Sequence, residues 1–266
     1  MDQLREILSL LRSGELSEEE AAARIGALTR GEHLERVDRL AQLDVFRERR
    51  AGVPEVVFAQ TKPPKVTVKI VDALLERKGL AFATRVSEAT FQALRDKYSG
   101  EPEVEIEEHE LARAVVVRKK GIELPTGLGR VGVVSAGTSD LPVAEEARVT
   151  ARVLGCEVLT SYDVGIAGFH RIFEPLRRML QADASAMVVV AGMEGTLPGV
   201  VASLVDVPVV GVPTSTGYGF GGGGVGALTT MLQCCVPGLV VVNVDNGFGA
   251  GAAAALIARQ AAKGTK

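Results

Sequence analysis

The chain has 266 residues, a formal net charge of −3, 24% charged residues and 47% hydrophobic residues. This composition is typical of a globular protein with one large domain or two smaller ones. The negative charge argues against a nucleic-acid surface, and no apolar run reaches the roughly 18 residues of a membrane helix. Three cysteines without paired spacing, and an N-terminus without signal-peptide features, predict a cytoplasmic protein.

Residues 1–120 predict a small, helix-rich α/β domain. A capping box from Ser17 to Glu20 predicts the start of a helix over 21–28, and an apolar face predicts a second helix over 34–49. The elements expected after it are a strand over 55–58, a helix over 65–77, a strand over 80–84, a helix from a Ser87 cap through Lys97, and a half-exposed strand over 103–107. A linker over 121–127 would end this domain.

Residues 121–266 have a different pattern, in which short Val-rich runs alternate with helical patterns. Nearly continuous apolar runs are typical of parallel strands buried on both faces. We therefore expect a doubly wound, flavodoxin-like parallel sheet with its ligand beyond the carboxyl ends of the strands. The expected strands are 131–134, 156–160, 187–191, 207–212 and 239–244, and the expected helices are 143–154, 168–180, 198–204, 225–232 and 252–262.

The first two loops after these strands carry small, hydroxyl and charged residues. Hydroxyls at a helix N-terminus suit a phosphate. Asp140 either holds ribose hydroxyls or caps its helix, and Arg171 either binds an anion or lies in a solvated first turn. The candidate ligand-binding residues of the two loops are Gly137, Thr138, Ser139, Asp140, Asp163, His170 and Arg171.

The later loops offer a carboxylate and a turn. Gly192 and Gly195 are candidate substrate-binding residues, and Glu194 between them is either a general base or a surface turn residue. The glycine-rich loop over 213–224 matches neither a Walker loop nor a dinucleotide fingerprint, so it is a mobile lid or a packing surface for a neighbouring subunit. In the last loop, Asp245, Asn246 and Gly247 either anchor a ligand or shape a turn.

Two of the cysteines, Cys234 and Cys235, are adjacent between an expected helix and an expected strand. A thiol near anion-suited loops suggests covalent chemistry, whereas a free cysteine also packs well in a core. Position alone leaves both interpretations open.

Taken together, the strings AGTSD, DVGIAGFHR, AGMEGTLPG, MLQCCVPG and VVNVDNGFGAG resemble the LarB family, most strongly over residues 120–255. That family is the pyridinium-3,5-biscarboxylic acid mononucleotide synthase, which begins synthesis of the nickel-pincer nucleotide cofactor. The resemblance implies that nicotinic acid adenine dinucleotide is the substrate, CO2 or bicarbonate the carbon source, and AMP a product. It also implies that Cys235 is the nucleophile, Glu194 the acidic residue and Arg171 the arginine of the second loop.

The chain departs from the family pattern at two places. Cys234 stands where a serine is common, and residues 59–63 replace a frequent Gly-Glu-Gly-Lys-Thr string. The same half of the chain is similar to the aminoimidazole ribotide carboxylase/mutase family, which forms octamers. A homo-oligomer is therefore expected.

A single subunit would keep Cys235 and Glu194 at opposite edges of the sheet. This separation predicts active sites shared between subunits. Mg2+ would suit the phosphoanhydride cleavage, although no ligand set for it is evident in the sequence.

Two other functions stay open. A purine-pathway carboxylase or mutase needs no thiol, but Gly137 replaces its first-loop serine and its usual histidine is missing near Asp163. A nucleotide-binding regulatory module would bind its ligand without turnover, and substitution of Cys235 would not affect it.

Overall fold

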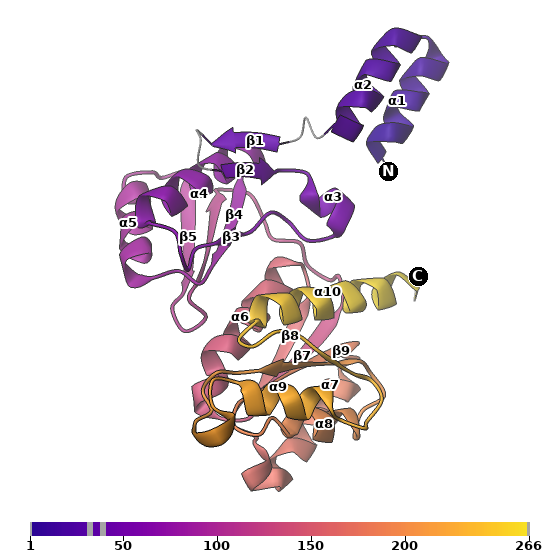
Figure 1. Cartoon of the computed structure of the whole chain (residues 1–266). Coiled ribbons are helices and arrows are strands. Elements are labelled where there is room, and N and C mark those ends of the chain that lie inside the picture. The colour runs from indigo at the N-terminus through magenta and orange to yellow at the C-terminus, as the bar shows by residue number, and fades with distance from the viewer. Residues whose placement is uncertain (1, 31–33, 38–40, 265–266) are drawn as a thin grey trace.

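The computed structural model describes residues 2–30, 34–37 and 41–264 (Figure 1). The chain begins with the helices α1 (Asp2–Ser13) and α2 (Glu18–Arg30), which pack on each other through a small apolar cluster. The predicted capping box is confirmed: the N–H and hydroxyl of Ser17 lie 2.9 Å from Glu20 Oε2, and the Glu20 N–H returns a bond of 3.2 Å to Ser17 Oγ.

The helix predicted over 34–49 is wrong. Two antiparallel strands, β1 (Leu34–Val37) and β2 (Ala41–Asp44), stand there, followed by the short helix α3 (Arg47–Ala51); residues 38–40 lie outside the described part of the chain. Val37 and Leu43 are buried in the same apolar core as the inward-facing residues of α4. A short apolar run fits helix and strand alike, and here the tertiary contacts decide.

A four-stranded sheet, called the N-terminal sheet below, follows. Its order is β3-β4-β6-β5, and α4 and α5 cover one face. Its predicted elements are confirmed, including the Ser87 cap, whose Oγ accepts the Thr90 N–H at 3.3 Å; β6 was not predicted. The elements are β3 (Val57–Phe58), α4 (Pro64–Lys78), β4 (Leu80–Thr84), α5 (Glu88–Tyr98), β5 (Val104–His109) and β6 (Ala114–Lys119).

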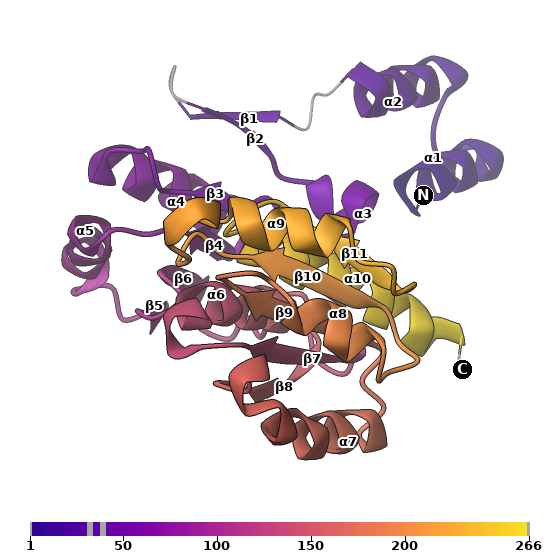
Figure 2. The same cartoon turned by 60° about the horizontal axis from the view of Figure 1, so that its bottom comes forward.

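The rest of the chain forms a parallel sheet of five strands, the C-terminal sheet, in the order β11-β10-β9-β7-β8. This order is the flavodoxin-like one, so the predicted fold is confirmed. Helices α6 and α10 pack on one face of the sheet, and α7, α8 and α9 pack on the other (Figures 1 and 2). The strands are β7 (Arg130–Ser135), β8 (Glu157–Ser161), β9 (Ala186–Ala191), β10 (Val209–Pro213) and β11 (Leu239–Val241). The helices are α6 (Leu141–Val153), α7 (Phe173–Gln181), α8 (Leu197–Ala202), α9 (Val225–Leu232) and α10 (Gly247–Gly264).

The residue types explain the layers. Alternate residues of β9 face the two helical layers, because Val188 and Val190 contact the α6 side while Met187 and Val189 contact the α7 side. Helices α6 and α10 approach closely, and a Cβ on Gly251 would lie 2.4 Å from a carbonyl oxygen of α6. None of the helices in the described ranges is long and apolar enough to span a membrane.

The N-terminal sheet packs against α6 and α10 (Figure 1). The contact has an apolar centre, in which Phe82 and Val116 meet Val149, Val153 and Phe248. This burial places α6 and α10 between the N-terminal sheet and the C-terminal sheet.

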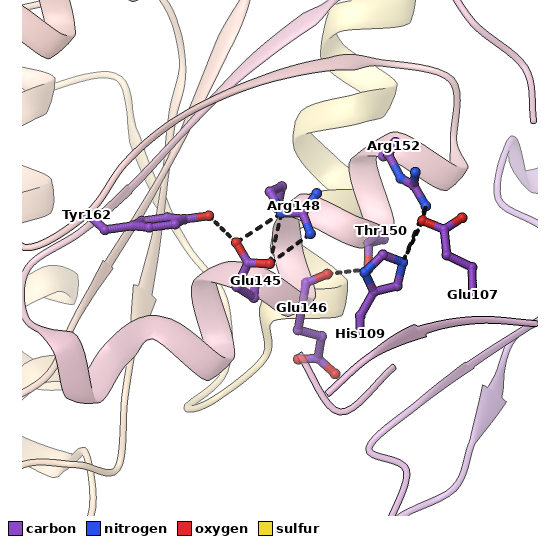
Figure 3. Close-up of polar contacts among 8 residues, drawn as sticks. All are labelled: Glu107, His109, Glu145, Glu146, Arg148, Thr150, Arg152 and Tyr162. Carbon is purple, nitrogen blue, oxygen red and sulfur yellow. Dashed lines mark hydrogen bonds and ion pairs between the residues drawn. The ribbon is translucent and has the colours of Figure 1, made fainter. Parts of the chain in front are cut away.

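A polar cluster extends the contact between β5 and α6 (Figure 3). His109 Nε2 lies 3.2 Å from Glu107 Oε1 and 3.3 Å from Arg152 Nη2, and Arg152 also pairs with Glu107. Burial is the largest influence on His109 and lowers its pKa, with Arg152 and Arg148 acting in the same direction and Glu107 opposing them. Neutral His109 is therefore the form that suits this contact.

Candidate active site

The candidate site lies at the carboxyl edge of the C-terminal sheet, where the winding direction changes between β7 and β9. Hydrogen bonds join the loops there. The N–H of Asp163 reaches Ser135 Oγ at 3.4 Å, and the N–H of Gly165 reaches the Ala136 carbonyl at 2.8 Å. The first and second loops therefore form one continuous surface.

Asp140 is the centre of this surface. Its side chain is only 4% exposed, and it accepts bonds from the Gly137 N–H at 2.9 Å, the Thr214 hydroxyl at 2.6 Å and the Thr216 hydroxyl at 3.1 Å. A carboxylate has about four acceptor positions. Three of them are thus occupied by groups of the first and fourth loops, and the side chain makes no capping bond to α6, so Asp140 does not cap that helix. Thr138 and Ser139, beside it, are exposed.

In the second loop, Arg171 donates to Asp163 Oδ2 at 3.0 Å. Both residues, and His170, are exposed, and His170 and Arg171 lie in the 3-10 turn Ile166–Ile172 rather than in the first turn of α7. Asp163 has a φ of 56°, an uncommon conformation for a residue other than glycine. The structure brings these residues together, and Asp163 already neutralises the charge of Arg171.

The third loop is held against the fourth. Gly192 is buried, and a Cβ there would lie 2.4 Å from the Thr216 hydroxyl. Gly195 has a φ of +66°, and a Cβ on it would lie 2.7 Å from the Ala227 Cα in α9. Both glycines allow close packing, while Glu194 between them is exposed. Its carboxylate is therefore available to a ligand at the switch point.

The residues of the fifth loop have structural contacts. Asp245 Oδ1 accepts the Ser215 N–H at 2.8 Å, and Asn246 Oδ1 caps α10 by accepting the Gly249 N–H at 2.8 Å. Gly247 is buried against α6, where a Cβ would lie 2.3 Å from the Val143 carbonyl. These contacts correspond to the turn interpretation of this loop.

The two adjacent cysteines differ in environment. Cys234 is half-buried, and its Sγ would lie 2.8 Å from a Cβ on Gly199 in α8, whereas Cys235 is exposed. A pocket of about 590 Å³ between α8 and α9 is lined by Gly195 and Thr196 at one end and by both cysteines at the other. Helix α9 separates these ends, and its eight residues span about 12 Å. Cys235 therefore lies at the opposite end of a groove from the Glu194 loop.

Sequence reasoning missed the part of the N-terminal sheet that reaches this edge. Arg85, directly after β4, donates from Nε to Glu146 Oε1 at 3.1 Å and from Nη2 to the Asp245 carbonyl. Glu146 is 3% exposed; burial, the largest influence, raises its pKa although Arg85 opposes it. Its Oε2 accepts the Phe248 N–H at 3.2 Å.

Arg113 lies beside Arg85. The Val86 N–H donates to the Arg113 carbonyl at 2.8 Å, and Arg113 Nε returns a bond to the Val86 carbonyl at 3.2 Å. The signal in the sequence that could have identified Arg85 is its position directly after a strand. This signal was insufficient, because the sequence does not indicate which end of the N-terminal sheet lies near the C-terminal sheet.

No group of three or more His, Cys, Asp or Glu side chains in the described ranges is arranged to hold a metal ion. Mg2+ bound through substrate phosphates needs only one or two protein carboxylates, so the expected Mg2+ stays a prediction.

Comparisons with known proteins match both parts of the chain. Residues 34–120 match the LarB/PurE-like N-terminal domain, and residues 130–266 match AIR carboxylase. Uncharacterized protein MJ0165 of Methanocaldococcus jannaschii is 42% identical over 96% of this chain and 97% of its own length.

Two other relatives match the C-terminal part alone. The N5-carboxyaminoimidazole ribonucleotide mutase of Thermotoga maritima is 31% identical over 48% of this chain and 74% of its own length. The mutase of the same name from Methanocaldococcus jannaschii is 32% identical over 43% and 69%. Family membership thus supports an enzyme of the carboxylase or mutase type. With a LarB/PurE-like N-terminal domain followed by an AIR carboxylase domain, the chain belongs to the LarB family.

Proposed function

We propose that the protein carboxylates C5 of the pyridinium ring of nicotinic acid adenine dinucleotide and hydrolyses the phosphoanhydride. The products are pyridinium-3,5-biscarboxylic acid mononucleotide and AMP. The observation that carries this proposal is the exposed thiol of Cys235 at one end of a groove whose other end lies beside Glu194.

The ring chemistry explains the need for a thiol. A pyridinium ring is electron-poor, so C5 is a poor nucleophile toward CO2. Addition of the Cys235 thiolate at C6 breaks the aromaticity and gives an enamine with electron density on C5. C5 then attacks CO2, Glu194 removes the C5 proton, and the thiolate leaves as the ring rearomatises. Covalent catalysis divides one difficult step into easier ones.

The exposure of both Cys235 and Glu194 supports sites shared between subunits, because a neighbouring subunit can reach both side chains. Within one subunit the two backbones are separated by roughly the length of α9, about 12 Å. In the proposed assembly, Cys235 of one subunit faces the Glu194 loop of another. A cationic pyridinium then stabilises the Cys235 thiolate by direct charge attraction. The oligomer is homomeric, and an octamer is the form that the family resemblance implies.

The test is turnover with nicotinic acid adenine dinucleotide and bicarbonate, with AMP and the dicarboxylate measured by chromatography. We expect Cys235→Ser to abolish carboxylation, Glu194→Gln to slow it at least about 100-fold, and Cys234→Ser to retain it. A fully active Cys235→Ser variant would remove the basis of the proposal. A protein that light scattering shows to be monomeric and that is fully active would refute the shared site.

A purine-pathway mutase is the second candidate, because several relatives of the C-terminal part carry that name. An aminoimidazole is already an enamine and needs no thiol. Turnover of N5-carboxyaminoimidazole ribonucleotide that persists in Cys235→Ser would identify this activity. Mg2+ remains a prediction for the phosphoanhydride cleavage, to be tested by adding and chelating the ion.

A further inference from the structure

A second cavity lies where the N-terminal sheet meets the carboxyl edge of the C-terminal sheet. It has a volume of about 210 Å³. This space accommodates a phosphate or carboxylate group but not a whole dinucleotide. Arg85 and Arg113 line it from one side, and Ser139, Ser215 and Thr216 line it from the other.

Both arginines stand at the same end of the N-terminal sheet, one after β4 and one before the adjacent strand β6. Both have left-handed backbone conformations, with φ of 58° for Arg85 and 49° for Arg113. Such a conformation is strained for a residue with a side chain, and strain of this kind clusters at ligand-binding sites. Two strained arginines therefore face one cavity.

The charges in this cavity are unevenly paired. Arg85 neutralises Glu146, whose other oxygen accepts an N–H of α10. Asp245 Oδ1 accepts the Ser215 N–H. Arg113 has no ion pair with a carboxylate among the residues that the structure describes, and its contact there is Nε to the Val86 carbonyl. The terminal nitrogens of Arg113 are the cationic donors left for a ligand.

We infer that Arg113, supported by Arg85 and the hydroxyls of Ser139 and Thr216, binds a phosphate group of the nucleotide substrate. A guanidinium forms two parallel bonds to a phosphate, and neighbouring hydroxyls supply further donors. The inference rests on the proposed function in one respect, that the ligand is a nucleotide. It assigns the cationic part of this phosphate site to the N-terminal sheet and the hydroxyl part to the C-terminal loops.

Calorimetric titration tests it without requiring turnover. The probes are AMP against adenosine, and nicotinic acid mononucleotide against its riboside, so that each pair differs by one phosphate. For Arg113→Gln we expect about 10- to 100-fold weaker binding of at least one phosphorylated probe and unchanged binding of its nucleoside. This loss of affinity corresponds to the removal of one charge-assisted hydrogen-bonded pair. The affected pair identifies which phosphate occupies the cavity. Arg113→Lys should lose less, because it keeps the charge.

Arg12→Gln is the matched control, because it removes the same charge from the exposed surface of α1. Equal binding of all probes by Arg113→Gln and the unaltered protein would overturn the inference. An equal loss for a nucleotide and its nucleoside would do the same. If Arg113→Gln discriminates as expected but carboxylation is absent, the phosphate site stands and the proposed reaction fails.

Discussion

Asp140 offers the clearest quantitative test of how the active-site loops are held. In Asp140→Ala the Gly137 N–H and the hydroxyls of Thr214 and Thr216 lose their acceptor. The two hydroxyls lie 2.8 Å apart and can still bond each other. We therefore count two lost bonds to a charged group at the lower end of their range, a total of about 3 kcal/mol of unfolding free energy.

Urea unfolding followed by circular dichroism measures this loss. With a slope of about 2–3 kcal/mol per molar urea, the midpoint should fall by about 1 M. Thr216→Val is the control, since it removes one of the three bonds and should shift the midpoint far less. If both variants unfold at the same urea concentration, Asp140 does not hold the loops together. Weaker nucleotide binding by Asp140→Ala at unchanged stability would instead support the contact with ribose.

Three further predictions concern the layers around the site. Because burial lowers the pKa of His109 below the ordinary 6.5, its stabilising contribution is present above pH 6.5 and is lost as the pH falls through the lower folded-state value. The urea midpoint of His109→Gln should therefore fall less between pH 7 and pH 5 than that of the unaltered protein, and equal falls would contradict this. Gly251→Ala should lower the free energy of unfolding by about 1–3 kcal/mol, because the added methyl group overpacks α6 against α10. Gly264→Ala is the control and should change it little, because the space around Gly264 is open. Calorimetric melting compares the two variants, and equal melting temperatures would contradict the close packing. Burial raises the pKa of Cys156 to about 11, whereas Cys235 is exposed. Iodoacetamide at pH 8 should therefore label Cys235 and spare Cys156 in the folded protein, as measured by peptide mapping. Labelling of both cysteines at equal rates would contradict the difference in burial.

The C-terminal sheet was predictable because each buried parallel strand carries its own signature, a continuous apolar run such as Met187 to Ala191. The chain over 34–49 was not, because the same apolar spacing fits a helix and a hairpin, and contacts with distant residues decide between them. The strand β6 was missed although its Val-rich run resembles the others. It lies between the acidic strand β5 and the linker.

The loops of the candidate site were located by the rule that ligands bind beyond the carboxyl ends of parallel strands. The rule places the loops of Asp140 and Thr214 at one edge, but it does not specify their contacts, because β9 lies between the strands that precede them. The rule does not locate Arg85 and Arg113, which approach this edge from the N-terminal sheet. Their approach depends on how the N-terminal sheet packs against the rest of the chain, which no local pattern encodes.

Intact-protein mass spectrometry tests the central claim most directly. The protein is incubated with nicotinic acid adenine dinucleotide, with and without bicarbonate, quenched in acid and weighed. We predict a covalent adduct that peptide mapping places on Cys235 and that is absent from Cys235→Ser. Turnover that proceeds in Cys235→Ser, or an adduct confined to Cys234, would contradict the account.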